Sequence, residues 1–315
     1  MVHLSSKNIK GKNYLYAVRS VRLPNGKVLK LSKRVKDKNE TASLKGFFDN
    51  KQVSEFASYY RRHCLPFNVR DADALEKMER MRLEYREIVG KLTPVQLKDL
   101  FDRFTVNFTY ESNALEGNSL TLKQVAIVIH ENLSIEGKDL REVYETRNSR
   151  EVVDLILKRK FKVSEKNALK MHSMLVRDMG IAEGYKQFPN YLHGRQVVTA
   201  PPEEVPAKMK DLFAWFKQNK HKMHPLQLAA RLHGKFEEIH PFEDGNGRVG
   251  RFLVLVALAS GGYPPLIVRK TQRLSYFNAL EDFDNGRPQI LEKFLYERLK
   301  ETHDKFFKIY AKYQK

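Results

Sequence analysis

Several features that would place the protein in a special class are scarce or absent from this sequence of 315 residues. It has one cysteine, Cys64, which excludes an intramolecular disulfide framework and a zinc site built from several cysteines. Its 16 glycines and 12 prolines are too few for a collagen-like or low-complexity chain. No apolar run reaches the ~18 residues of a membrane-spanning helix, and the N-terminus lacks the apolar segment of a secretory signal. We therefore expect a soluble, cytoplasmic, globular protein that does not enter a membrane.

Positive charge is concentrated near the N-terminus. Residues 1–70 hold 16 Lys and Arg against 4 Asp and Glu, which gives +12 of the chain's net charge of +19. A basic block of this kind attracts nucleic acid, acidic proteins or anionic surfaces. A solvated basic surface would give the same count. A nucleic acid or acidic partner for this segment is therefore one interpretation, and an ordinary charged surface is the other.

The order of sequence patterns predicts a mostly α-helical chain with a short, basic, β-containing module at its N-terminus. Alternating segments at 14–23 and 27–35 flank Pro24-Asn25-Gly26, and Asn-Gly between such segments is typical of a hairpin. Residues 36–70 show short helical stretches at best. We therefore divide the chain into a basic module over 1–70 and a helical region over 71–315. The helices are expected over 72–89, 94–115, a short stretch after Thr121, 141–158, 164–179, 203–218, 225–239, 247–260, 271–284 and 288–312.

The segment with the most informative chemistry is IHPFEDGNGRVGRFLVLVALASGG, residues 239–262. Gly245-Asn246-Gly247 is a permissive turn directly before an apolar helix, so backbone N–H groups at the positive helix end can converge on an anion. Arg248 and Arg251 are three residues apart and therefore share one helix face beside this turn. Guanidinium groups suit phosphate oxygens, so this segment predicts a phosphate-binding site.

Two further side chains beside this turn suggest group transfer rather than simple binding. Asp244 precedes the glycines, and Mg²⁺ commonly takes one or two carboxylates together with substrate phosphates. His240 comes just before, and imidazole is the usual general base near neutral pH. A base, a metal ligand and a phosphate site are the parts that phosphoryl-type transfer requires.

The twelve residues from His240 to Arg251, HPFEDGNGRVGR, resemble the full motif of the Fic family, HPFxDGNGRxxR, and match it at every specified position. The resemblance extends to the helix before the motif, to a flap segment that starts at Phe188, and to the last helices. It implies a Fic-type helical bundle with a small β-hairpin flap and a Fic core over about 120–300.

The resemblance implies a Mg²⁺-dependent protein adenylyltransferase that moves AMP from ATP to a Ser, Thr or Tyr hydroxyl of a target protein, with self-modification. His240 would be the catalytic base and Asp244 would hold Mg²⁺. The ATP phosphates would be bound by Gly245, Asn246, Gly247, Arg248 and Arg251. A flap hairpin would dock the target backbone or cover the nucleotide through Phe188, Tyr191, Gln196, Val197, Val198 and Thr199.

A second segment resembles the family's inhibitory-helix pattern, S/T-xxx-E-G/N. It runs from Ser112 to Gly117 at the end of an expected helix over about 94–116. The resemblance implies that Glu116 reaches Arg251 and competes with the γ-phosphate of ATP for the same guanidinium. An ordinary helix end is the other interpretation of these residues. We predict an ion pair between Glu116 and Arg251 and, with it, an autoinhibited enzyme.

Two other functions stay open at the level of the sequence. Glu116 could position a water molecule that removes AMP from a modified protein, which would make the protein a de-AMPylase. Residues 1–70 could bind nucleic acid and make the protein a regulator, although no helix-turn-helix or zinc signature supports this. The target protein, the physiological nucleotide and the formation of a homo-oligomer are not readable from the sequence.

Overall fold

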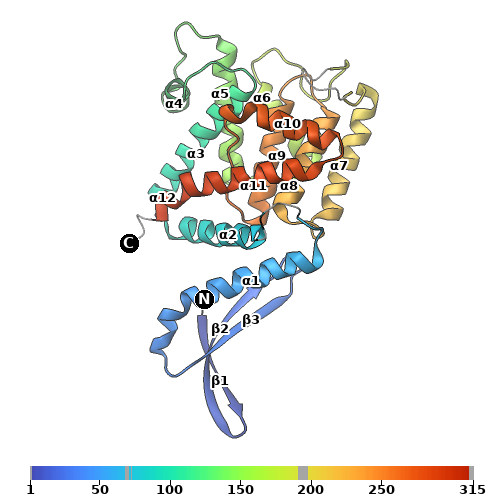
Figure 1. The fold of residues 1–315 in the computed structure, drawn as a ribbon. Helices are drawn as coiled ribbons and strands as arrows, with labels where there is room; N and C mark the ends of the chain where they lie inside the picture. The colour runs from blue at the N-terminus through green and yellow to red at the C-terminus, as the bar shows by residue number, and fades with distance from the viewer. Residues whose placement is uncertain (1, 68–70, 72, 191–197, 312–315) are drawn as a thin grey trace. The chain divides into compact units, whose positions relative to one another are not determined.

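A computed structural model describes residues 2–67, 71, 73–190 and 198–311. The chain forms two compact units, one of residues 1–83 with 221–224 and one of residues 84–220 with 225–315 (Figure 1). Within the described residues, no helix combines the length and the apolar composition that crossing a bilayer requires.

The first unit contains a three-stranded antiparallel sheet. Its strands pair in the order β1 (Val2–Ile9), β2 (Lys12–Arg22) and β3 (Val28–Val35). The predicted hairpin is confirmed, because β2 and β3 flank Pro24-Asn25-Gly26 and pair in register from Arg22 opposite Val28 to Leu15 opposite Val35. The strand β1 was not predicted, because its sequence carries few large apolar residues.

The prediction of only short helical stretches within 36–70 is wrong. A 3₁₀ turn (Asn39–Leu44) leads into α1 (Lys45–His63), a helix of 19 residues. Glycine, asparagine, serine and aromatic residues are weak helix formers, so local propensity gives little sign of α1. The helix is stabilised by burying one face against the sheet. Its buried residues are Phe48, Val53, Phe56, Ala57, Tyr59 and Tyr60.

The second unit is a bundle of helices, as the mostly helical prediction required. The helix α2 (Ala74–Lys91) crosses the division between the units. The other helices are α3 (Pro94–Leu115), α4 (Leu122–Glu131), α5 (Leu140–Leu157), α6 (Glu165–Val176), α7 (Val205–Asn219), α8 (Pro225–Ile239), α9 (Asn246–Gly261), α10 (Arg273–Asp284), α11 (Pro288–Thr302) and α12 (Lys308–Ala311). Short 3₁₀ turns cover Pro202–Glu204 and Lys270–Gln272, and a π-helical turn covers His303–Phe307.

Local sequence signals set where α3 begins and ends. The Thr93 hydroxyl accepts a hydrogen bond from the Gln96 N–H at 3.3 Å, and the Gln96 side chain accepts one from the Thr93 N–H at 3.0 Å. This capping box, followed by proline, starts the helix as predicted. Gly117, with a φ of +102°, follows the last turn and ends it. The end of α3 therefore has a defined position, which matters because Glu116 lies there.

The helix α9 forms the apolar centre of the second unit. Its residues from Phe252 to Leu258 are buried, as their uniformly apolar sequence predicts. The helix contacts α3, α5, α6 and α8 (Figure 1). Because α9 is packed on several sides, its N-terminal end is held in a fixed position among these neighbours.

The packing of α8 against α10 leads to a stability prediction. A Cβ at Gly234 would lie 2.6 Å from the ring of Phe283, so Gly234→Ala forces the helices apart. We expect this change to lower the free energy of unfolding by ~1–3 kcal/mol, measured by urea denaturation. The control is Gly90→Ala in α2, which has no neighbouring atom within 4 Å of the added methyl group and should raise stability by ~0.5–1 kcal/mol. Changes of the same sign in both variants would contradict this account of the contact.

Candidate active site

The turn between α8 and α9 brings the Fic-like motif residues onto one loop. His240 has a φ of +49° and Gly245 a φ of +82°, so the chain reverses direction within a few residues. The side chain of Asn246 fixes the loop, because it accepts from the Phe242 N–H at 2.9 Å and donates to the Phe242 carbonyl at 2.8 Å. Both polar groups of the Asn246 side chain are therefore bonded within the loop. The backbone N–H of Asn246 remains available to bind an anion.

The N-terminus of α9 is open at the end of this loop. The first helical hydrogen bond runs from the Val249 N–H to the Gly245 carbonyl at 2.9 Å. The N–H groups of residues 246–248 therefore precede the helical ladder and carry its partial positive charge. Such an end, preceded by a glycine with positive φ, suits an anion.

His240 lies beside this end, next to a carboxylate that the sequence reasoning missed. Its Nδ1 is 3.6 Å from Glu237 Oε2, one helical turn earlier on α8, and the imidazole is mostly buried. At this distance the carboxylate makes no hydrogen bond to Nδ1, but it can pair with a protonated imidazole and it leaves Nε2 for a substrate. Glu237 lies three residues before His240, at the end of the helix predicted over 225–239, and this spacing was a signal that could have identified it.

Arg248 is almost fully buried and joins two acidic side chains. Its Nη1 is 3.2 Å from Glu145 Oε1 on α5, and its Nη2 is 3.3 Å from Asp244 Oδ1. The other oxygen of Glu145 accepts from the Asn118 side chain at 2.9 Å. Glu145 and Asn118 are about 100 residues or more before Arg248 in the sequence, and no pattern in their segments links them to the motif. They could therefore not have been identified from the sequence.

Asp244 lies at the rim of the site, with its side chain about one third exposed. Its Oδ2 is 2.6 Å from Arg141 Nη2, a contact that the sequence also did not indicate. Burial alone would raise the pKa of this carboxyl, but Arg248, the Gly245 N–H and Arg141 outweigh burial and lower it. Asp244 is therefore an ionised carboxylate beside an anion-binding turn, and this chemistry fits a Mg²⁺ ligand that shares the ion with phosphate oxygens.

The predicted ion pair between Glu116 and Arg251 is formed. Arg251 Nη2 lies 2.7 Å from Glu116 Oε1, and the arginine is 4% exposed. Arg251 also donates to the hydroxyl and to the carbonyl oxygen of Ser112, both at 2.9 Å. Burial by itself would lower the pKa of Arg251, but Glu116 and Tyr276 raise it overall. The guanidinium is thus a permanent cation that the end of α3 neutralises.

The carboxylate of Glu116 lies over the N-terminus of α9. A Cβ at Gly247 would collide with Glu116 Oε1 and would lie 3.0 Å from Arg251 Nη1. Glycine at position 247 is therefore what allows the carboxylate to approach both the helix end and the arginine. The Glu116 carboxylate therefore lies at the place, beside the turn and Arg251, where a phosphate group would bind.

A buried layer beneath the site supports Arg251. The Tyr276 ring centre is 5.9 Å from the guanidinium, and the Tyr276 hydroxyl is 2.6 Å from His233 Nε2. Burial raises the pKa of Tyr276. A Cβ at Gly250 would meet the His233 ring at 2.6 Å, so α8 and α9 approach closely here. His233 of α8 therefore packs directly beneath the motif helix.

The opposite side of the loop is held by α6 and by the first residues of the predicted flap. His172 stacks on Phe242 with ring centres 3.9 Å apart, and its Nε2 lies 3.1 Å from the Asp244 carbonyl oxygen. Burial lowers the pKa of His172 to about 4, so the imidazole is neutral near pH 7. Asn190 donates to the Phe242 carbonyl at 2.8 Å. Both contacts fix the backbone that carries Asp244.

The predicted flap is described only in part, because Tyr191, Gln196 and Val197 lie outside the described residues. Phe188 is 81% exposed and Val198 is 88% exposed, so both present apolar surface to solvent. Thr199 is buried instead. Its hydroxyl donates to the Asn190 carbonyl at 2.8 Å, so this side chain holds the base of the segment and does not face a partner.

The histidines outside the motif were also candidate metal ligands over the part of the chain that the structure describes. Within the described residues, no group of three or more His, Cys, Asp or Glu side chains is placed to hold a metal ion. His224 belongs to the first unit, where it lies 3.5 Å from Glu79. His193 lies outside the described residues.

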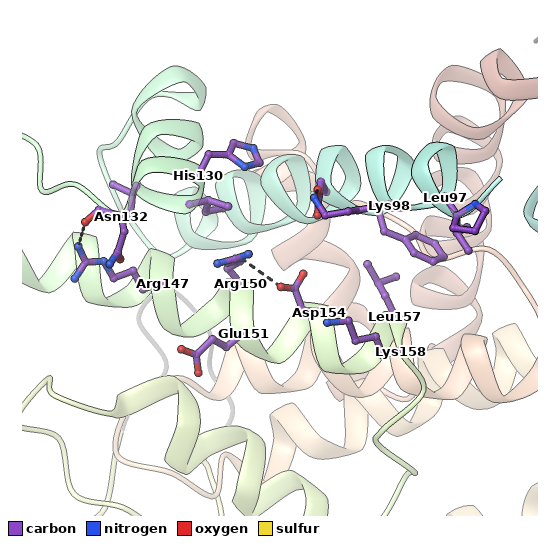
Figure 2. A pocket seen from close by; sticks show the side chains of 15 residues that line it. Leu97, Lys98, His130, Asn132, Arg147, Arg150, Glu151, Asp154, Leu157 and Lys158 are labelled. Carbon is purple, nitrogen blue, oxygen red and sulfur yellow. Dashed lines mark hydrogen bonds and ion pairs between the residues drawn. The ribbon is translucent and has the colours of Figure 1, made fainter. Parts of the chain in front are cut away.

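A large pocket lies away from the motif, along α3, α4 and α5 (Figure 2). Its volume is about 1020 Å³, and none of the motif residues lines it. Charged side chains of the lining pair with other lining groups: Lys98 with Asp102 at 2.8 Å and Arg150 with Asp154 at 3.3 Å. Figure 2 shows the second of these pairs as a dashed line between two side chains of α5.

Known proteins resemble this chain in sequence and in fold. A family model described as Fic/DOC family matches residues 162–258. Curated relatives named protein adenylyltransferase Fic include one from Drosophila ananassae, 26% identical over 245 residues, which are 75% of this chain and 49% of the relative. Another, from Drosophila virilis, is 29% identical over 199 residues, which are 62% of this chain and 41% of the relative. The chain thus spans about half the length of these curated relatives.

A solved structure gives the same result for the fold. The crystal structure of a Fic domain containing signaling protein from Bacteroides thetaiotaomicron is 26% identical, with a TM-score of 0.68, and covers 74% of this chain and 96% of that one. The segment that the family model matches contains α6, the motif turn and most of α9. Residues 162–258 of the chain therefore match the Fic/DOC family, and the chain has the fold of a Fic domain containing protein.

Proposed function

We propose that the protein is a protein adenylyltransferase that transfers AMP from ATP to a Ser, Thr or Tyr hydroxyl of a target protein and of itself. The observation that carries this proposal is the motif turn, which holds an imidazole with a carboxylate near its Nδ1 beside an open helix N-terminus and two buried arginines. The names of the curated relatives support the same activity.

The phosphate chain of ATP would bind at the N-terminus of α9. The N–H groups of residues 246–248 supply hydrogen-bond donors, and Arg251 supplies the charge that meets the γ-phosphate. Arg248 is fixed by Glu145 and adds positive potential under the loop. Asn246 contributes by keeping the loop in shape, since both polar groups of its side chain are bonded to Phe242.

The transfer step would use His240 as the base. The target hydroxyl oxygen forms a bond to the α-phosphorus of ATP, the bond from that phosphorus to the pyrophosphate oxygen breaks, and His240 Nε2 takes the hydroxyl proton. Glu237 stabilises the imidazolium that results, because its carboxylate lies on the Nδ1 side. A general base contributes ~10²–10⁴-fold to such reactions.

Asp244 would hold the Mg²⁺ ion that accompanies ATP. When bound, the ion neutralises phosphate charge and fixes the geometry of the triphosphate. The carboxylate is ionised and partly exposed, but it is paired with Arg141 in the structure. Binding of the ion would therefore require Asp244 to exchange Arg141 for Mg²⁺.

The protein would be autoinhibited by the end of α3. Glu116 neutralises Arg251 and lies over the helix N-terminus, so it competes with the γ-phosphate for both. The carboxylate would also repel a bound γ-phosphate and tilt the triphosphate away from in-line attack. A misplacement of ~1 Å can lower a rate by ~100-fold.

Target proteins would dock at the flap, where Phe188 and Val198 expose apolar side chains. An extended target segment that pairs by main-chain hydrogen bonds would place its hydroxyl side chain over the loop with little demand on sequence. The first test of the whole proposal is intact-mass analysis after incubation with ATP and Mg²⁺. An addition matching one AMP supports the transfer reaction, and its absence in the wild type and in Glu116→Gly contradicts it.

Replacement of His240 tests the base. We expect His240→Ala to lower AMP transfer by at least ~100-fold, because a general base contributes ~10²–10⁴-fold to such a step. The measurement is incorporation of labelled AMP with saturating ATP. His130→Ala, an exposed histidine on α4, is the matched control and should keep wild-type activity. Near-normal AMP transfer by the His240 variant would show that His240 is not the catalytic base.

Replacement of Asp244 tests the metal ligand. Asp244→Asn keeps an acceptor for the Gly245 N–H but removes the charge that attracts Mg²⁺. We expect the Mg²⁺ concentration for half-maximal transfer to rise by at least ~10-fold. Asp211→Asn, on the exposed face of α7, should leave it unchanged. An unchanged Mg²⁺ requirement in Asp244→Asn would exclude this carboxylate as the ligand.

Replacement of Glu116 tests autoinhibition. Glu116→Gly frees Arg251 for the γ-phosphate, and glycine is acceptable at the helix end, so self-modification should rise by at least ~10-fold. Addition of Arg251→Ala should remove most of this gain. The control is Glu131→Gly, an exposed glutamate that ends α4. Equal rates of self-modification for Glu116→Gly and the wild type across a range of ATP concentrations would show that Glu116 is not inhibitory. It would then be an ordinary residue at the end of a helix.

A further inference from the structure

The sheet of the first unit has two faces with different surroundings. One face packs against α1, and its alternate residues include Ala17, Val21, Leu31 and Val35. Because successive side chains of a strand point to opposite faces, the residues between them form the other face. We call it the outer face. Its residues on the three strands are His3, Ser5, Lys7, Ile9, Lys12, Tyr14, Tyr16, Val18, Ser20, Arg22, Val28, Lys30, Ser32 and Arg34.

The outer face carries positive charge and no negative charge. Residues 1–36 contain ten Lys and Arg and no Asp or Glu. Cations on the face turned to α1 have partners: Arg19 pairs with Asp49 at 2.5 Å, and Lys33 lies over the Phe47 ring. Among the described residues, the outer-face cations form no ion pair with a carboxylate; they are Lys7, Lys12, Arg22, Lys30 and Arg34. The charge therefore stays available to a partner.

Tyrosine rings and hydroxyl groups lie between these cations. Lys7 Nζ is 5.0 Å from the centre of the Tyr16 ring, and the Arg34 guanidinium is 4.0 Å from the Tyr14 ring. These contacts hold the cations against the sheet without neutralising them. Hydroxyl groups lie next to basic groups on neighbouring strands. Tyr16 of β2 lies opposite Ser5 of β1 on one side and opposite Arg34 of β3 on the other.

We propose that the outer face of this sheet binds duplex DNA. Its cations are spread along the whole length of the strands, which matches the continuous charge of a phosphate backbone rather than one short acidic segment. The strand β2 has 11 residues, so it is ~36 Å long at ~3.3 Å per residue. One turn of duplex DNA has a similar length, ~34–36 Å.

The shape of the face suits the major groove. That groove admits a β-ribbon, and lysine, arginine, serine and tyrosine side chains supply most contacts to phosphates and base edges. A membrane surface is a poorer match, because the exposed large apolar residues of this face, Ile9 and Val28, lie at strand ends.

The test is fluorescence anisotropy with the full chain and a labelled random-sequence duplex of ~20 bp, about two helical turns. We expect binding at ~50 mM salt that weakens steeply as salt rises. The variant Lys7→Gln/Lys30→Gln/Arg34→Gln should bind at least ~10-fold more weakly and reduce the slope of log K against log salt by about 3, one for each lost phosphate contact. These side chains are exposed, so the fold should be kept.

The matched control removes the same charge elsewhere. Lys210→Gln/Lys217→Gln/Lys300→Gln replaces three exposed lysines of the second unit and should leave affinity and slope unchanged. Equal losses in the two triple variants would overturn the proposal, because diffuse charge would then explain binding. No DNA binding by the wild type at ~50 mM salt would also overturn it. Displacement by polyglutamate as effective as by unlabelled duplex DNA would assign the face to acidic proteins instead.

Discussion

The guanidinium of Arg251 is buried within the second unit, and a buried positive charge requires anionic or hydrogen-bonding partners. The residues around Arg251 are arranged to supply them. A buried cation without a partner costs several kcal/mol, and an arginine cannot lose its proton to escape this cost. The end of α3 supplies Glu116 and two oxygens of Ser112. The same cation is the group that a phosphate would seek, so stability of the resting protein and access of an anionic substrate depend on one side chain.

The other features of the site serve to place Arg251 and its neighbours. The apolar residues of α9 bury the helix among α3, α5, α6 and α8, which fixes its N-terminal end. Gly247 leaves room for a carboxylate at that end, and Gly250 lets α8 approach so that His233 and Tyr276 can lie beneath the arginine. Each glycine acts through close packing rather than through flexibility, since a methyl group would be in contact with a side chain that the site requires.

The sequence predicted this site well where the information is local. The twelve motif residues contain the turn, the helix start and both arginines, so their proximity follows from adjacency. The contact between Glu116 and Arg251 was predicted only because a second short pattern resembled the same family. Arg141 and Glu145, which contact Asp244 and Arg248, are ordinary charged residues of a helix, and nothing in their spacing connects them to the motif. In the first unit α1 was missed because its weak helix formers depend on packing against the sheet, whereas Asn25-Gly26 marked the hairpin directly.

The central claim is that Glu116 and the γ-phosphate compete for Arg251. Calorimetric titration of ATP and of ADP into the wild type and into Glu116→Gln measures this directly, because ADP lacks the competing group. The account predicts that the substitution strengthens ATP binding by at least ~10-fold, which is ~1.4 kcal/mol, and changes ADP binding much less. An equal change for the two nucleotides, or no change for ATP, would contradict it.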